Sequence, residues 1–348
     1  MLPKAILPED SNPVLHPLRP ATASRRCCGM AVAEQPLPER VGITGKMRVL
    51  LLGGSGFVSG AIARMAVSQG HQVTIVTRGI KPLPSGVNAL KADRSIPGSL
   101  EAAVTSSQGD FDLVVDCIGY QASDARQDLA LFGKRCRHLV FISSDFVFDP
   151  EKRQFPQPEN NPFFLTDDSY GANKRRCELE FFQATESSCR WSILRPCHIY
   201  GPGSRLGCFP EHGRDPKLIE HLLNGDPIRL VAAGRFLQQP IFVDDLARLL
   251  LSCPYSPCSA GQIYHCAGPD LVESVTYYRI IAELLGCILQ VQEIPILNYL
   301  QEHPEQKSFL CHRIYDLQKI RMDCLSVPET TLRSGLQIHL KSILDMPS

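Results

Sequence analysis

The stretch MRVLLLGGSGFVSG, residues 47–60, is the part of the sequence that decides the fold. RVLLLG (48–53) is a continuous apolar run, which is typical of a strand that is buried on both faces of a parallel sheet. FVSGAIARMAVSQG (57–70) follows with apolar residues at helical spacing and ends at a glycine. A strand, a glycine-rich turn and a helix in this order predict the opening unit of an α/β sheet.

Strand-like segments alternate with helical stretches after this unit. The further strands are expected at HQVTIVT (71–77), FDLVVDCIG (111–119), RHLVFISS (137–144) and WSILRPC (191–197). The alternation predicts an α/β fold, a Rossmann-type doubly wound parallel sheet with a smaller C-terminal substrate lobe. We expect the sheet domain to comprise residues 47–200 and about 237–268, and the lobe to comprise 201–236 and 269–348.

The glycines at the first turn point to a dinucleotide. Gly53, Gly54 and Gly56 lack side chains, so backbone N–H groups can approach a pyrophosphate at the positive end of the following helix. The strand before the motif and the helix after it supply the context that the motif requires. A tight turn without a ligand is the alternative interpretation.

The end of the second strand bears on the choice of cofactor. In VTIVTRG (73–79), Thr77 and Arg78 stand where an acidic residue would hold the ribose of NAD. An arginine can pair with the 2′-phosphate of NADP, so NAD(P) is the predicted cofactor and NADP is favoured. A solvated loop charge is the alternative for Arg78. The full set of predicted cofactor contacts is Gly53, Ser55, Gly56, Phe57, Val58, Thr77, Arg78, Asp93, Arg94, Ile118, Tyr170 and Lys174.

The stretch DDSYGANKRRCE (167–178) carries the predicted chemistry. Tyr170 and Lys174 are one helical turn apart, so the ammonium can reach the phenol and favour the phenolate. Lowering a phenol pKa from about 10 to about 7 takes roughly 4 kcal/mol, which we expect from the lysine together with the positive nicotinamide in a shielded cleft. Ser144, where the strand 137–144 ends, is the expected partner for the substrate oxygen, in preference to Ser143. Ser144, Tyr170 and Lys174 are therefore the predicted catalytic residues.

These motifs, taken in order, resemble the extended short-chain dehydrogenases/reductases, also called the NAD-dependent epimerase/dehydratase family. GGSGFVSG is similar to the family's nucleotide loop, ISSDFVF to its serine strand end, YGANK to its Tyr-x-x-x-Lys, and LRPCHIYGPG to its Arg-Pro…Tyr-Gly-Pro segment. FVDDLA (242–247) and 267–286 resemble later family features. The resemblance implies a catalytic Ser144–Tyr170–Lys174 set, with Lys174 also binding the nicotinamide ribose. It also implies a homodimer interface near the helix that bears Tyr170.

Several positions depart from the family pattern. Ser59 stands where the last glycine of the loop is usual, and CIGY (117–120) replaces an Asn-containing segment. Asp145 matches the acid of the sugar-nucleotide dehydratases, but Phe146 occupies the position of their base, so simple 4,6-dehydration is disfavoured. Gln238 and Gln239 replace the arginine that holds a substrate pyrophosphate in the epimerases, which weakens the case for a nucleotide diphosphate unless Arg235 or Arg205 supplies the charge.

The lobe is expected to close a cleft over the carboxyl edge of the sheet, with helical patterns at 275–286 and 329–344. The candidate substrate contacts are Tyr120, Asp145, His198 and Arg235. A structural role is the alternative for each of them, since a histidine beside an apolar strand is commonly a core residue.

Composition narrows the classes of function. The 348 residues are 44% hydrophobic with a formal net charge of zero, which disfavours a nucleic-acid partner, and no apolar run is long enough for a membrane span. The scattered 14 cysteines indicate reduced thiols and a cytoplasmic protein. Cys253, Cys258, His265 and Cys266 fit no zinc spacing, so no metal is predicted. The proline-rich residues 1–46 predict a disordered extension, either a targeting segment or the product of an upstream start site.

Three functions follow from the sequence. The first is an NAD(P)-dependent oxidoreductase or epimerase that acts on a hydroxyl or ketone of a sugar or nucleotide sugar. The second is a ketosugar reductase, since SSDFVFD (143–149) resembles a stretch of the dTDP-4-dehydrorhamnose reductases. The third is a non-catalytic RNA-binding protein of the same fold, since GGSGFVSG…VTRG is similar to the chloroplast stem-loop binding branch.

Overall fold

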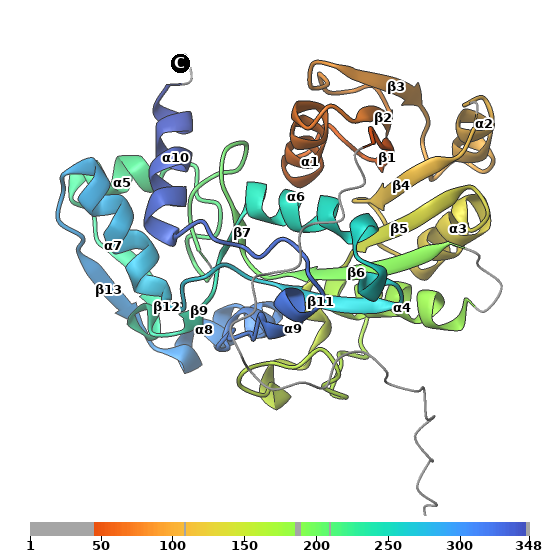
Figure 1. The fold of residues 1–348 in the computed structure, drawn as a ribbon. Coiled ribbons are helices and arrows are strands. Elements are labelled where there is room, and N and C mark those ends of the chain that lie inside the picture. The colour runs from red at the N-terminus through yellow and green to blue at the C-terminus, as the bar shows by residue number, and fades with distance from the viewer. Residues whose placement is uncertain (1–44, 108, 185–188, 209, 346–348) are drawn as a thin grey trace, which may run out of the picture. The chain divides into compact units, whose positions relative to one another are not determined.

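The computed structural model describes residues 45–107, 109–184, 189–208 and 210–345. The predicted disordered extension therefore lies almost entirely outside the described residues. The described part is arranged around a seven-stranded sheet with the order β11-β6-β5-β4-β1-β2-β3 (Figure 1). Its strands are β1 (Arg48–Leu52), β2 (Gln72–Thr77), β3 (Val87–Lys91), β4 (Phe111–Asp116), β5 (Cys136–Ile142), β6 (Arg190–Pro196) and β11 (Gln262–Cys266). All six pairings are parallel, as the sequence predicted for a doubly wound sheet.

Both faces of the sheet are covered by helices, which explains why β1 is apolar at successive positions. Val49 and Leu51 belong to the core under α1 (Phe57–Ser68) and α6 (Val243–Ser252). Leu50 and Leu52 belong to the opposite core, which also contains residues of the other three helices. These helices are α2 (Ser99–Thr105), α3 (Ala122–Phe132) and α4 (Tyr170–Gln183).

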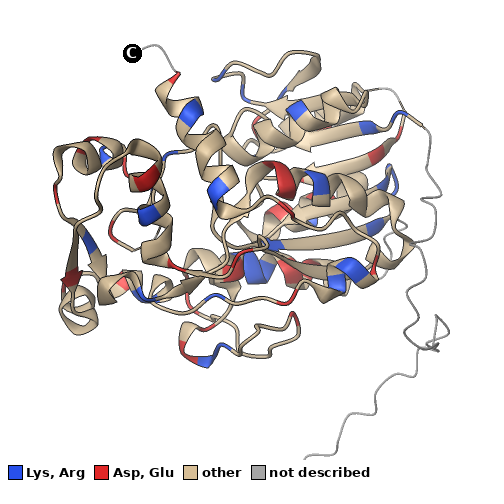
Figure 2. Ribbon diagram, turned by 60° about the vertical axis from the view of Figure 1, so that its left-hand side comes forward, with Lys and Arg blue, Asp and Glu red and all other residues tan. Residues whose placement is uncertain are grey.

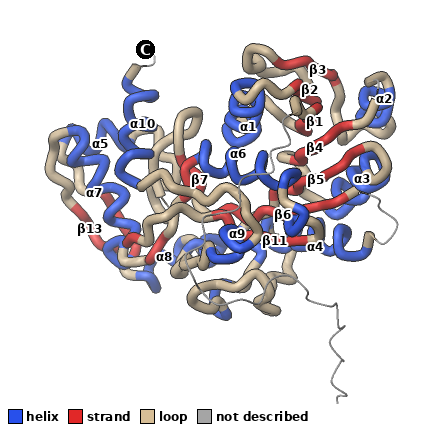
Figure 3. Tube along the Cα trace, in the orientation of Figure 1, coloured by secondary structure: helices blue, strands red, loops and turns tan. Residues whose placement is uncertain are grey.

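The remaining elements build a second, smaller part from short paired strands and helices joined by long loops (Figure 3). The strand pairs are β7 (Ile199–Tyr200) with β10 (Ile241–Phe242), β9 (Leu237–Gln238) with β12 (Val272–Glu273), and β8 (Ile228–Val231) with β13 (Val291–Ile294). The helices are α5 (Leu218–Asn224), α7 (Ser274–Leu285), α8 (Ile296–Glu302) and α10 (Leu332–Leu344). Helix α9 (Gln318–Met322) packs instead against the sheet, because its Ile320 is buried in the core beneath α1 and α6. The 3₁₀ turns are η1 (Asp145–Val147), η2 (Pro150–Lys152), η3 (Ala232–Gly234), η4 (Cys253–Tyr255), η5 (Pro257–Ser259) and η6 (Pro304–Phe309).

The core of this second part is formed mainly by α5, α7 and α10. Leu218, Tyr277, Tyr278 and Leu336 are buried in one apolar cluster. Helices α7 and α10 occupy the segments in which the sequence showed helical spacing.

One stretch differs from the predicted boundary at residue 269. Tyr315, Leu317, Ile320 and Leu325 are buried in the core that lies beneath α1 and α6. The C-terminal segment thus returns to the sheet before α10 rejoins the second part. The apolar spacing of this short stretch gave no sign of which core it would enter.

Candidate active site

A cavity of about 680 Å³ lies at the carboxyl ends of β1, β2, β3 and β4. The predicted cofactor contacts from the first half of the chain all line it, namely Gly53, Ser55, Gly56, Phe57, Val58, Thr77, Arg78, Asp93, Arg94 and Ile118. Lys81, which the sequence analysis did not single out, lines it as well. Its place three residues after Arg78 was the signal that could have identified it.

The glycine loop is shaped to bring backbone close to a ligand. Gly53 and Gly54 have φ values of 89° and 150°, and a Cβ atom on Gly54 would lie 2.4 Å from the Ile75 side chain. Helix α1 begins at Phe57, so its N-terminus opens on the cavity. Ser59, the departure from the family loop, is buried and its Oγ accepts a hydrogen bond from the Gly56 N–H at 3.2 Å. The loop therefore fits a dinucleotide pyrophosphate, with the serine bracing the turn.

Two arginines that line this cavity, Arg94 and Arg78, differ in how far their guanidinium groups are free to contact a ligand. Arg94 is paired with Asp116 at 3.0 Å, Asp128 at 2.9 Å and Asp124 at 3.4 Å. Because its guanidinium is paired with these three carboxylates, Arg94 lines the cavity but has little capacity left to bind a ligand. Arg78 is exposed at the same cavity.

A second cavity of about 580 Å³ adjoins the first, since Val58, Cys117, Tyr120 and Arg214 line both. Its walls include all three predicted catalytic residues, Ser144, Tyr170 and Lys174. The segments that carry them lie far apart in the chain and meet at the carboxyl edge of the sheet.

Helix α4 sets the positions of Tyr170 and Lys174. It begins at Tyr170, and the Ser169 hydroxyl caps it by accepting a hydrogen bond from the Ala172 N–H at 3.4 Å. Gly171 allows the helix to approach η1, because a Cβ atom there would lie 1.9 Å from the Phe146 carbonyl oxygen. Lys174 is 2% exposed.

The ammonium of Lys174 is held by backbone carbonyls. Its Nζ donates to the oxygens of Gly119 at 2.7 Å and Ile142 at 2.8 Å, and lies 5.9 Å from the centre of the Tyr170 ring. Burial lowers the pKa of Lys174, and the Asp116 carboxylate opposes that effect. The segment CIGY (117–120), which departs from the family pattern, thus has a structural role, because its Gly119 carbonyl is one of the two hydrogen-bond acceptors for Lys174.

The phenol of Tyr170 stays protonated in the protein as it stands. Burial and the neighbouring Tyr120 phenol raise the pKa of Tyr170 to about 12, against the lowering effects of the Ser144 hydroxyl and of Arg214. Lys174 alone does not produce the phenolate that the sequence analysis considered. Lowering the pKa would require the positive charge of a bound nicotinamide.

The two serines at the end of β5 have different partners. Ser143 donates a hydrogen bond from its Oγ to Glu178 at 2.6 Å and is committed to the core. The Ser144 Oγ accepts from the Phe146 N–H at 3.2 Å and lines the second cavity. This geometry supports Ser144 as the residue that can contact a substrate oxygen.

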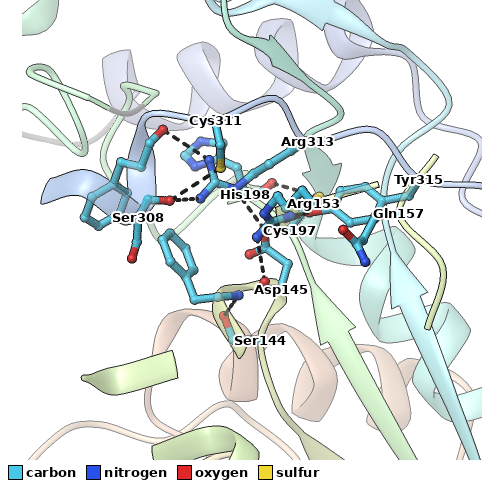
Figure 4. A network of polar contacts seen from close by, with 12 residues as sticks. Ser144, Asp145, Arg153, Gln157, Cys197, His198, Ser308, Cys311, Arg313 and Tyr315 are labelled. Atoms are coloured by element: carbon cyan, nitrogen blue, oxygen red, sulfur yellow. Dashed lines mark hydrogen bonds and ion pairs between the residues drawn. The ribbon is translucent and has the colours of Figure 1, made fainter. Parts of the chain in front are cut away.

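Asp145 is not placed as a substrate contact. It is fully buried, and its Oδ2 accepts hydrogen bonds from Arg313 Nε at 2.8 Å and Tyr315 Oη at 2.7 Å, with Arg153 at 3.2 Å (Figure 4). These groups lower the pKa of Asp145 against the effect of burial. The sequence could not indicate this role, because two of the three partners come from the far C-terminal segment.

The other substrate candidates fall into two groups. Tyr120 and His198 line the second cavity, and burial lowers the pKa of His198 to about 3, so its ring is neutral. Arg235 is exposed and belongs to the described lining of neither cavity. The structure therefore does not bring Arg235 into the lining of either cavity.

The lining residues that the sequence analysis missed include Arg214, Ser308, Phe309 and Arg313. They come from loops and from η6, which have no repeating pattern. Only the cluster of charged residues in HGRDPK (212–217) could have drawn attention to Arg214.

Other kinds of site are not apparent in the described residues. No three His, Cys, Asp or Glu side chains among them form a group that could hold a metal ion. None of the twelve cysteines in this part of the chain is in a disulfide. No helix in the described ranges has the length and apolar character needed to cross a bilayer.

Comparisons with known proteins agree with this geometry. Residues 49–266 match the model of the NAD dependent epimerase/dehydratase family. The chain is 35% identical over 280 residues to the 2'-dehydrokanamycin reductase of Streptomyces kanamyceticus, covering 78% of this chain and 77% of that protein. It is 24% identical to the 2-alkyl-3-oxoalkanoate reductase of Stenotrophomonas maltophilia, covering 84% of this chain and 98% of that protein.

Two further similarities bear on fold and on alternatives. The chain is 25% identical to the chloroplast stem-loop binding protein of 41 kDa b of Arabidopsis thaliana over 67% of its own length, and the match spans 61% of that protein. The solved structure of epimerase Mth375 from Methanothermobacter thermautotrophicus superimposes with a TM-score of 0.71 at 17% identity, covering 86% of this chain and 93% of that one.

Proposed function

The chain belongs to the NAD-dependent epimerase/dehydratase family, and on that premise we propose that it is an NAD(P)-dependent oxidoreductase acting on a hydroxyl or ketone of a sugar derivative. One observation carries the proposal. Ser144, Tyr170 and Lys174 line one cavity, and that cavity adjoins a second one built around the glycine loop. The arrangement gives a reacting carbon access both to a proton and to a dinucleotide.

Each residue has a separate task in ketone reduction. The Tyr170 phenol donates its proton to the substrate oxygen, and the Ser144 hydroxyl holds that oxygen by a hydrogen bond. Lys174, fixed between two carbonyls, positions the cofactor ribose and favours the phenolate that forms. The nicotinamide, when bound, supplies the hydride that reduces the carbonyl carbon and is itself oxidised. Oxidation of a hydroxyl is the reverse of these steps.

The reduction direction is favoured by two features. Tyr170 has a raised pKa and is therefore a proton donor at neutral pH. Among similar proteins, the 35% identical one is named as a reductase. Two features count against an elimination of the dehydratase type. The Asp145 carboxylate is bonded to Arg313, Arg153 and Tyr315. The next residue, Phe146, cannot act as the base.

NADP is the cofactor form that the charges favour. Arg78 and Lys81 line the dinucleotide cavity near the end of β2, where the chain has Thr77 in place of an acid. Two cations at this position suit a 2′-phosphate better than an unmodified ribose.

A homodimer and a cytoplasmic location belong to the same proposal. Leu179 and Phe182 of α4 are 39% and 42% exposed, which supports a contact between copies along this helix. The free thiols of the twelve cysteines in the described ranges suit a reducing compartment.

RNA binding is the second candidate, favoured by the similarity to the stem-loop binding protein. The charges count against it, because basic and acidic residues are interspersed over the fold rather than gathered on one face (Figure 2). A titration with structured RNA at physiological salt tests this candidate, and saturable binding would favour it.

The principal test is a turnover screen. Keto sugars are offered with NADPH or NADH, and oxidation of the nicotinamide is followed by absorbance. We expect reduction of at least one ketone by the wild-type protein and its loss in Tyr170→Phe. Turnover that Tyr170→Phe leaves unchanged would contradict the assignment.

A further inference from the structure

Arg214 is the charged residue that the function has not yet explained. It lines both the dinucleotide cavity and the substrate cavity. It makes no hydrogen bond or ion pair with any residue in the described part of the chain, and it is exposed. An arginine at the junction of two cavities, with its donors open, is placed to meet an anion.

The other two cations in the described lining of the substrate cavity, Arg313 and Lys174, already have hydrogen-bond acceptors in the protein. Arg313 bonds Asp145 at 2.8 Å and the Ser308 carbonyl at 2.6 Å (Figure 4). Lys174 is held by two backbone carbonyls. Glu305 is exposed and lies 3.7 Å from the His303 ring nitrogen. Among the described lining residues, Arg214 is therefore the cation that is available to form an ion pair with a substrate.

The turn that carries Arg214 is held by contacts of its neighbour His212. Gly207 has a φ of 119°, and a Cβ atom there would lie 1.7 Å from the His212 carbonyl oxygen. The His212 ring bonds Asp215 at 2.7 Å and accepts a hydrogen bond from the Arg229 N–H at 3.2 Å. These contacts fix both ends of the short turn in which Arg214 lies.

The backbone of Arg214 itself is in an unfavourable conformation. Its φ is 57°, in the left-handed region that residues other than glycine rarely adopt. Such a conformation persists only where the surroundings enforce it, most commonly at functional sites. Here it directs the guanidinium to the cavity junction.

The field of Arg214 reaches the reacting groups. It opposes the effect of burial on the pKa of Tyr170, and it adds to burial in lowering the pKa of His198. An anion that contacts Arg214 therefore lies in the cavity that Tyr170 also lines.

Gln238 and Gln239, which stand where the epimerases have an arginine that binds the substrate, carry no positive charge, so Arg214 would have to supply one. The Gln239 amide donates to the Gly268 carbonyl at 2.9 Å and accepts from the Tyr315 N–H at 2.9 Å, so it has a structural task. Gln238 lines the cavity but is uncharged. Neither Arg205 nor Arg235 lines the cavity.

We propose that Arg214 binds an anionic group of the substrate, a single carboxylate or phosphate close to the reacting carbon. A nucleoside diphosphate, which spreads its charge over two phosphoryl groups, is the less suitable occupant of a site with one open guanidinium. This inference rests on the proposed function and narrows its substrate class to acidic or phosphorylated sugar derivatives.

Chemical modification of the wild-type protein tests the contact without a known substrate. Phenylglyoxal reacts with accessible guanidinium groups, and peptide mass spectrometry follows the rate at Arg214, with the exposed Arg205 as internal control. NADP⁺ is added alone, and then together with D-glucuronate, D-glucose 6-phosphate or neutral D-glucose. We expect either anion to slow modification of Arg214 at least about threefold, and D-glucose to leave it unchanged.

Two results would overturn the inference. Complete protection by NADP⁺ alone would assign Arg214 to the cofactor pyrophosphate. Equal rates with the anions and with D-glucose would show that no anion binds. The two acids compared with each other distinguish carboxylate from phosphate.

Variants supply an independent measurement. Once a substrate ketone is found, Arg214→Gln should raise KM about 10- to 100-fold with a smaller change in kcat, and Arg214→Lys should recover part of the loss. Arg205→Gln is the matched control and should leave KM unchanged. A fall in kcat at constant KM would contradict substrate binding by Arg214. If Tyr170→Phe keeps full turnover while the anions still protect Arg214, the proposed catalysis fails and the anion site stands.

Discussion

Asp145 and Arg313 are 168 positions apart in the chain and form a buried ion pair of 2.8 Å directly beneath the substrate cavity. Asp145 immediately follows Ser144, and Arg313 follows the turn η6 that lines the opposite wall. The pair therefore ties the wall of the cavity to the strand end that carries a predicted catalytic group.

Asp145→Asn tests this tie. Removing one charge of a buried pair leaves Arg313 and Arg153 without compensation, so the free energy of unfolding should fall by about 3 kcal/mol or more, measured by urea denaturation. Hydrogen exchange should accelerate in residues 304–313. Glu180→Gln, which removes a partner of the largely exposed Arg126, is the control and should cost less than about 1 kcal/mol. Equal losses in both variants would refute the structural role.

Tyr170→Phe removes the proton carrier and leaves the ring in place. We expect kcat to fall about 10²- to 10⁴-fold, while the Kd for NADPH, measured by fluorescence, changes less than about twofold. Tyr255→Phe, at a tyrosine outside both cavities, should change neither quantity. A parallel loss of cofactor affinity would indicate a structural role for the hydroxyl instead.

Arg78→Gln should alter the preference between cofactors. Losing a charge-assisted bond to the 2′-phosphate should weaken NADPH binding about tenfold or more and leave NADH binding nearly unchanged. Isothermal titration with both cofactors measures the difference, and Arg126→Gln on α3 is the control. If the variant loses affinity for both cofactors equally, Arg78 does not select between them.

Gly171→Ala should destabilise the protein by about 1–3 kcal/mol or more, because the added carbon would lie 1.9 Å from the Phe146 carbonyl oxygen and a backbone atom cannot rotate away. Gly60→Ala is the matched control in α1, where the nearest atom is the mobile end of Arg64 at 3.3 Å. Urea denaturation of both variants gives the comparison. A neutral Gly171→Ala would show that α4 is not packed against η1 as described.

His138 should make the protein sensitive to acid. Burial, together with the charges of Arg190 and Arg137, lowers its pKa from 6.5 to about 4 in the folded state. Between these values the unfolded chain binds a proton that the folded chain does not, so stability is full above pH 6.5 and falls as the pH drops toward 4, by roughly 3 kcal/mol. In His138→Gln the decline should be shallower by about one proton. Parallel stability curves for the two proteins between pH 7 and 4.5 would count against this origin.

Much of the sheet and of the dinucleotide cavity could be predicted from the sequence, because these features depend on local patterns. The apolar run of β1, the glycines after it and the spacing of Tyr170 and Lys174 each lie within one short segment. Their positions at the carboxyl edge follow from the parallel order of strands.

The remaining features depend on contacts between distant segments. Arg94 was predicted as a cofactor contact, but its three carboxylate partners come from β4 and α3 and hold its guanidinium. Asp145 was predicted to line the substrate cleft, but in the structure its carboxylate is bonded to Arg313 and Tyr315, which come from the C-terminal segment. Arg214 lies in a loop without periodicity, where no sequence pattern predicts which way a side chain points.

The return of the C-terminal segment to the sheet has a consequence for biosynthesis. Leu317, Ile320 and Leu325 complete the core beside α6, although nearly all of that core is encoded much earlier in the chain. Until these residues have been translated, the half of the nascent chain that forms the sheet has an open apolar flank. Final closure of this half must therefore wait until residues 315–325 have emerged from the ribosome, and chaperones have an apolar surface to hold until then.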